Sequence, residues 1–126
     1  MMASGLATFR DIHETWAWVV VISNALAGLW ALAAHRWTAV RGRALWWFIG
    51  AAQVTVVVQA FLGAIMVGKY KVPLPQFHAF YGFFAIIAIA IIYSYRIQMR
   101  HRLYLLYAGG SLFIMGLAIR AMLLAP

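Results

Sequence analysis

The sequence contains no cysteine and only two acidic residues, Asp11 and Glu14. Without thiols the chain has no disulfides, no thiolate catalysis, no iron–sulfur cluster and no cysteine-ligated zinc. It also lacks a serine–histidine–acid set, a glycine-rich phosphate loop and an HExxH pattern. We assign no catalytic residue; whether the chain has an enzymatic activity of its own stays open, and a non-enzymatic role is favoured.

Charged residues are scarce as well, at 10% of the 126 positions, whereas hydrophobic residues make up 67%. In soluble domains about a quarter of the residues are charged and about half are hydrophobic. A soluble fold of this size cannot bury so much apolar surface, so the excess is expected to face lipid. Four apolar runs each approach the ~20 residues that cross a bilayer. They cover residues 15–34, 44–68, 77–95 and 103–124.

Short connections join these runs, which forces neighbouring helices to be antiparallel. The predicted fold is all-α, an integral membrane four-helix bundle with up-down-up-down topology. It forms a single transmembrane domain over residues 1–126. Asp11 and Glu14 precede a long first run, which is typical of a membrane span and not of a cleaved signal peptide.

Lysine and arginine lie in the gaps between the runs and give a net charge of +8. This distribution suits anionic lipid headgroups, whereas nucleic-acid binding needs a basic patch that the sequence lacks. The first and third connections contain Arg36, Arg41, Arg43, Arg96, Arg100 and Arg102. The opposite side contains Arg10, Lys69, Lys71 and Arg120, with both acids. The positive-inside rule predicts both termini outside the cytoplasm. Arginine- and alanine-rich loops suit a high-GC bacterium, so we expect the bacterial inner (cell) membrane.

Histidine is the one residue type here that is suited to hold a cofactor metal. His13 and His78 open the first and third spans on the outer side, while His35 and His101 lie on the inner side. His13 and His35 are ~33 Å apart along a helix and cannot share a ligand. The inner pair lies among arginines and suits headgroups. The outer pair is therefore the candidate metal site.

Small residues surround the outer pair. Gly82 lies one turn from His78 on the same face, and Gly63 lies at about the same depth, which leaves room for a flat macrocycle. If the first and third helices are diagonal, His13 and His78 would ligate one iron from opposite sides, and two imidazoles are a normal axial set for haem b. The alternative is that the histidines are interfacial and the small residues only pack helices. Rotation of one helix by half a turn would point them at headgroups.

Three further polar residues have both a structural and a functional interpretation. Arg120, near the end of an apolar run, is a candidate partner of haem propionates, together with other cations on that side. Gln59 by default bonds to a neighbouring helix. Alternatively, it contacts a quinone headgroup or a haem edge, because Gly63 one turn away admits a ring. Glu14 is either solvated or paired, and if it pairs with His13 it would orient that ring.

Residues 59–68 (QAFLGAIMVG) lead through a proline-containing loop to residues 77–83 (FHAFYGF). This arrangement resembles one four-helix half of the haem A synthase family, in which a Gln-x-x-Leu-Gly helix precedes a helix that opens with a haem-ligating histidine. The resemblance implies that His78 is a ligand and His13 its counterpart. The family joins two such halves and has an acidic residue before a histidine, whereas Glu14 follows His13. The enzymatic activity is therefore not expected here.

In size and layout the chain is also similar to small four-helix accessory subunits of bacterial respiratory oxidase assemblies. We expect an accessory or electron-transfer subunit of a bacterial respiratory membrane complex, with or without one haem b near the outer face. Its partners would be membrane lipids and other membrane subunits of that complex. Two other classes stay open: a cofactor-free structural or assembly protein, and a small oligomeric transporter. A transporter typically has a charge at the membrane midplane or a broken helix, and the sequence has neither.

Overall fold

Four long helices make up the fold, and the computed structural model describes residues 2–124. In chain order they are α1 (Met2–Arg36), α2 (Arg43–Tyr70), α3 (Gln76–Ser94) and α4 (Leu103–Leu123). Two short 3-10 helices, η1 (Thr38–Val40) and η2 (Arg100–Arg102), lie in the first and third connections. Residues 2–124 contain no strand, so the predicted all-α class with four helices is confirmed.

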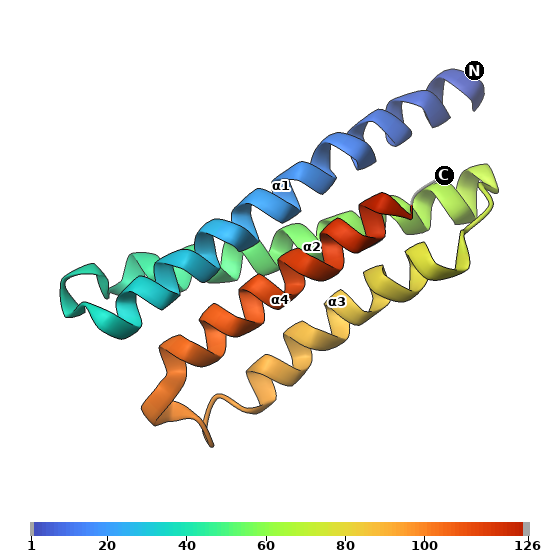
Figure 1. Cartoon of the computed structure of the whole chain (residues 1–126). Helices are drawn as coiled ribbons and strands as arrows, with labels where there is room; N and C mark the ends of the chain where they lie inside the picture. Colours follow the sequence, from blue (N-terminus) through green and yellow to red (C-terminus); the bar gives the residue numbers. More distant parts are fainter. Residues whose placement is uncertain (1, 125–126) are drawn as a thin grey trace.

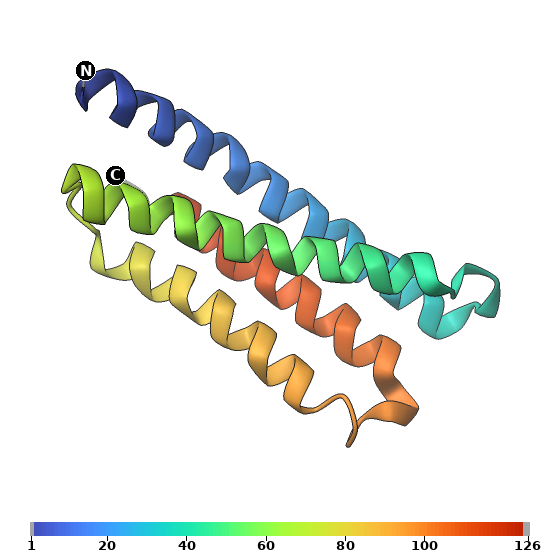
Figure 2. The same cartoon turned by 180° about the vertical axis from the view of Figure 1, so that it is seen from behind.

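The two ends of the bundle differ in composition (Figures 1 and 2). The first and third connections lie together at one end, which we call the arginine end (residues 37–42 and 95–102). The second connection lies at the opposite end with the start of α1 and the end of α4. We call this the proline end (residues 2–14, 71–78 and 117–124). All four histidines sort between these ends as the sequence predicts.

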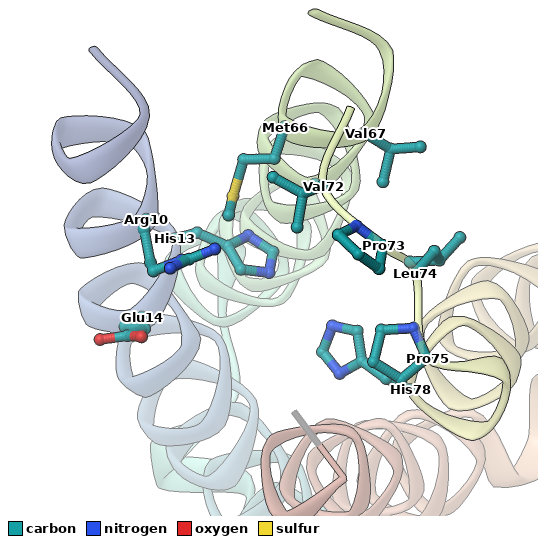
Figure 3. Close-up of a pocket in the computed structure, with 11 residues that line it drawn as sticks. Arg10, His13, Glu14, Met66, Val67, Val72, Pro73, Leu74, Pro75 and His78 are labelled. Carbon is teal, nitrogen blue, oxygen red and sulfur yellow. The ribbon is translucent and has the colours of Figure 1, made fainter. Parts of the chain in front are cut away.

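The helices form a ring in which α1 packs against both α2 and α4, and α3 packs mainly against α4. The contact between α2 and α3 is sparser. In Figure 3, α1 and α3 lie on opposite sides of the His13 and His78 rings. The diagonal placement on which the histidine pairing depends is therefore what the structure has.

The first helix is longer than its apolar run. It begins at Met2, whereas the run that predicts the span begins at Thr15. Phe9 packs its ring against Tyr70 of α2, with centroids 5.7 Å apart, which gives the early turns a tertiary partner. Hydropathy marks where a helix is apolar, not where it starts, so the sequence could not predict this extension.

Two residue types end α2 at the proline end. Lys71 adopts the left-handed conformation, with φ 56°, and its backbone N–H donates to the Met66 carbonyl, which closes the last turn. Pro73 and Pro75 follow and cannot continue the helix, because proline has no backbone N–H to donate. Residues 71–75 therefore cross over the proline end as an extended strap before α3 begins at Gln76.

The interior is built from small side chains and the exterior from large apolar ones. One buried cluster consists mainly of alanines, with Leu45 and Ile49 as its larger members. Large apolar side chains such as Trp47 and Phe61 are instead 75% and 67% exposed. All four helices are long and apolar enough to span a membrane. Large apolar groups outside and small ones inside are typical of helices that pack closely within lipid.

Candidate functional site

The His13 and His78 side chains point into the central space at the proline end (Figure 3). Their ring centroids are 6.1 Å apart and the ring planes are inclined by 72°. The two residues come from diagonal helices, α1 and α3, and lie at the same depth. The expected convergence of the two imidazoles is therefore what the structure shows.

His78 is held by the end of α4. Its Nδ1 lies 2.7 Å from the backbone carbonyl oxygen of Ala121. A carbonyl oxygen only accepts hydrogen bonds, so the proton of this bond belongs to Nδ1. In the neutral ring Nε2 then carries a lone pair, which is the form that binds a metal. The bond to Ala121 thus leaves Nε2 of the neutral ring without a proton.

His13 is held through its backbone and by close packing. The Gln59 amide nitrogen on α2 donates to the His13 carbonyl oxygen at 2.8 Å. Gly63, one turn further along α2, lies directly against the ring, since a Cβ built there would be 3.4 Å from His13 Cε1. The default interpretation of Gln59, an amide bonded to a neighbouring helix, is therefore confirmed for its nitrogen. Its Oε1 and the His13 Nδ1 are both buried without a partner.

Three hollows meet at His78. A cavity of about 70 Å³ lies between the two imidazoles and the strap, and Arg10, Glu14 and Met66 also line it. A second, of about 80 Å³, lies deeper in the bundle next to Gln59 and Gly82. The third is a groove of about 610 Å³ between α2 and α3, lined largely by glycine and alanine, including Gly63 and Gly82. Together they provide room beside both imidazoles.

The four lysine and arginine residues at and beside the proline end differ in their position relative to the two imidazoles. Arg10 lines the cavity between the imidazoles. Arg120 is exposed, its guanidinium lies over the Tyr81 ring at 5.9 Å, and it lines none of the three hollows. Arg10, Lys69 and Lys71 are exposed as well, but among these four cations only Arg10 lines that cavity. Arg10, and not Arg120, is thus the cation next to the two imidazoles.

The inner histidines do not form a comparable pair. His35 and His101 are both exposed at the arginine end. Arg41 instead organises this region, because its guanidinium donates to the carbonyl oxygens of Ala34 at 2.6 Å and His35 at 3.2 Å. These bonds satisfy carbonyls at the end of α1, which is a structural role.

Two neighbours of the site are not predicted from the sequence. Met66 is 7% exposed, and its side chain extends toward His13 in Figure 3. Its position three residues after Gly63 places both on one face of α2, so helical spacing could have indicated it. The Ala121 carbonyl could not have been found in this way, since a backbone acceptor carries no sequence signal.

The donor set of the site defines what it can hold. Two imidazoles on opposite sides of one metal have centroids about 6 Å apart, from two metal–nitrogen bonds of ~2 Å and the radii of both rings. The observed 6.1 Å matches this value. Within residues 2–124 no three histidine, cysteine or acidic side chains are placed to hold a metal ion.

Comparison of the chain with protein-family models, with curated proteins and with solved structures gives no match.

Proposed function

We propose that this chain is a membrane-embedded accessory or electron-transfer subunit of a bacterial respiratory complex, and that it binds one haem b between His13 and His78. The observation that carries the proposal is the 6.1 Å separation of the two imidazoles across the bundle interior. It is the separation that a single iron with two axial histidines requires. The tautomer of His78 supports it, because Nε2 is left free to coordinate.

Small residues beside the pair support the proposal of a flat macrocycle. If one were held between α1 and α3, its edges would face α2 and α4. Gly63 on α2 and Ala118 on α4 are small residues that line the hollows on those sides. Arg10 is the residue suited to pair with a propionate, since a guanidinium forms two parallel bonds to a carboxylate.

Axial ligation by two histidines limits what such an iron does. It leaves no open coordination position, so the iron would exchange electrons and would not bind a substrate. Electron transfer in a lipid phase needs redox partners in the same membrane. We therefore propose other membrane subunits as partners, and the large apolar side chains exposed along all four helices support both lipid and subunit contacts.

The proposed membrane placement is up-down-up-down, with both termini outside the cytoplasm of the bacterial inner membrane. The support is the charge asymmetry between the two ends. Both arginine-bearing connections lie at one end, whereas Asp11 and Glu14 lie near the other. Because cytoplasmic loops are enriched in lysine and arginine, the arginine end is assigned to the cytoplasm and the haem site to the outer face.

The test is the absorption spectrum of the purified full chain in mild detergent, with haem supplied during expression. The expected result is a Soret band with the sharp reduced bands of a low-spin haem b. His13→Ala and His78→Ala should each abolish these bands. His35→Ala and His101→Ala are matched controls at the other end of the bundle and should leave them unchanged.

Two outcomes would overturn the haem proposal. The first is a colourless wild-type sample that is fully helical by circular dichroism, which would favour the cofactor-free structural or assembly protein. The second is a Soret band that survives both outer substitutions. Recovery of redox subunits by co-purification of the wild-type chain tests the respiratory assignment separately, and a chain that always purifies alone would contradict it.

A further inference from the structure

The two imidazoles of the site are oriented by different means. His78 donates from Nδ1 to the Ala121 carbonyl oxygen, which determines the ligand nitrogen. His13 has no such partner, because its Nδ1 is buried and unpaired. A ring without an Nδ1 acceptor can carry its proton on either nitrogen, and only one of these tautomers leaves Nε2 free. His13 therefore has no hydrogen-bond acceptor at Nδ1 that would determine its tautomer.

Gln59 carries the complementary unmet group. Its amide nitrogen is bonded to the His13 carbonyl oxygen at 2.8 Å, which holds the amide head against this residue. Its Oε1, on the same amide carbon, is buried without a donor. Each of these two atoms, Gln59 Oε1 and His13 Nδ1, is buried without a hydrogen bond, which is unfavourable. The two residues contact each other across α1 and α2. One hydrogen bond between the two atoms would satisfy both.

Rotation of the two side chains would form this bond. The amide rotates about its terminal torsion, and the imidazole rotates about χ2, torsions that are broad in proteins. Gly63 lies against Cε1 but has no side chain, so no Cβ at this position blocks such a rotation.

We propose that Gln59 is the positioning residue for His13: its Oε1 accepts a hydrogen bond from Nδ1–H, which leaves Nε2 as the ligand atom. Gln59 would thus do for His13 what the Ala121 carbonyl does for His78. The role of this bond in ligation rests on the proposed haem binding, whereas the bond itself does not. Acceptors that bind the outer nitrogen of a metal-ligating histidine also raise its basicity.

The first experiment needs no haem. The chain is labelled with ¹⁵N-histidine, and nitrogen chemical shifts report which ring nitrogen of His13 is protonated. The expected result is the Nδ1–H form in the wild type and in Gln59→Glu, which keeps an oxygen acceptor. Gln59→Met, which removes the acceptor at similar volume, should shift His13 toward the Nε2–H form. Gln53→Met, a part-buried amide on the same helix, is the control and should leave His13 unchanged.

A His13 tautomer that is the same in wild type and Gln59→Met would overturn the proposal. So would an Nε2–H form in the wild type. Because the measurement is made on the haem-free chain, a chain that never binds haem can still show the expected tautomer. Failure of the haem proposal and failure of this one are therefore distinguishable.

The second experiment uses the haem-loaded chain. Loss of the acceptor makes His13 a weaker donor to the iron and disfavours the more positive oxidised state. The midpoint potential should therefore rise in Gln59→Met and stay near the wild-type value in Gln53→Met. A residue that only packs would change haem occupancy and stability but not the potential. An unchanged potential in Gln59→Met would overturn the positioning role.

Discussion

The Nδ1 atom of His78 and the carbonyl oxygen of Ala121 lie 2.7 Å apart and join the start of α3 to the end of α4. Ala121 is nearly buried at this contact, with 9% exposure. The bond serves the fold, because it closes the α3–α4 pair at the proline end. It also serves the site, because it leaves Nε2 of the ring available.

These two roles of His78 are separable by mutation. His78→Asn keeps a side-chain N–H donor for the Ala121 carbonyl but removes the ligand nitrogen. We expect a haem-free chain whose stability is close to that of haem-free wild type. His78→Leu removes both and should be about 1 kcal/mol less stable than His78→Asn, the typical net value of one hydrogen bond. Thermal unfolding followed by circular dichroism measures the difference, and equal stability of the two variants would show that the bond contributes nothing.

Space beside His13 depends on Gly63. A Cβ at this position would be 3.4 Å from His13 Cε1, which is ordinary contact, so Gly63→Ala should retain haem. Gly63→Leu should push the ring aside and reduce haem affinity at least tenfold, about 1.4 kcal/mol. Haem titration of the purified variants measures this. Gly50→Leu is the control on the same helix, because a Cβ there meets nothing within 4 Å. Full haem affinity in Gly63→Leu would contradict the placement of the macrocycle.

Much of the architecture was predictable because it depends on hydropathy and spacing along one helix. The four helices and the placement of His13 and His78 at the same end of the bundle follow from such patterns, whereas the convergence of the two rings does not. What the sequence could not predict depends on rotation of a helix about its own axis. Arg120 has the depth expected of a propionate partner, but α4 turns it outward onto Tyr81. The apolar run of α4 gives no strong amphipathic signal to determine that rotation.

This difference in orientation leads to opposite expectations for the two arginines. Arg10 lines the cavity between the imidazoles, so Arg10→Gln should lower haem affinity by about tenfold or more, the usual effect of losing a charged hydrogen bond. Arg120→Gln should leave the affinity unchanged, because Arg120 lies over the Tyr81 ring and outside the hollows. Haem titration of both variants provides the comparison. A larger loss in Arg120→Gln than in Arg10→Gln would reverse the assignment.

The seam between α1 and α4 depends on Gly28. A Cβ at Gly28 would lie 2.6 Å from Leu112 Cγ and 3.2 Å from the Ala108 carbonyl oxygen. The Leu112 side chain would have to move to make room for it, and the backbone oxygen cannot move without shifting α4. Gly28→Ala should therefore destabilise the bundle by roughly 1–3 kcal/mol, as overpacking of a close interface does. Gly109→Ala is the matched control on α4, where a Cβ meets nothing within 4 Å. It should be neutral or slightly stabilising, since alanine favours a helix. Unfolding in detergent separates the two, and equal stabilities would show that α1 and α4 do not approach as closely as described.

The orientation in the membrane is testable directly, because the chain has no cysteine of its own. Gln76 at the proline end and Gln98 at the arginine end are both exposed and of the same type, so they form a matched pair for single-cysteine substitution. A membrane-impermeant maleimide added to intact cells should label Gln76→Cys at once and Gln98→Cys only after lysis, since the arginine end is assigned to the cytoplasm. The reverse pattern would place the imidazole pair on the cytoplasmic face, and its electron partners would then have to be sought on that side. Equal labelling of both positions in intact cells would contradict the membrane-spanning arrangement itself, because one reagent cannot reach both ends of a bundle that crosses the bilayer.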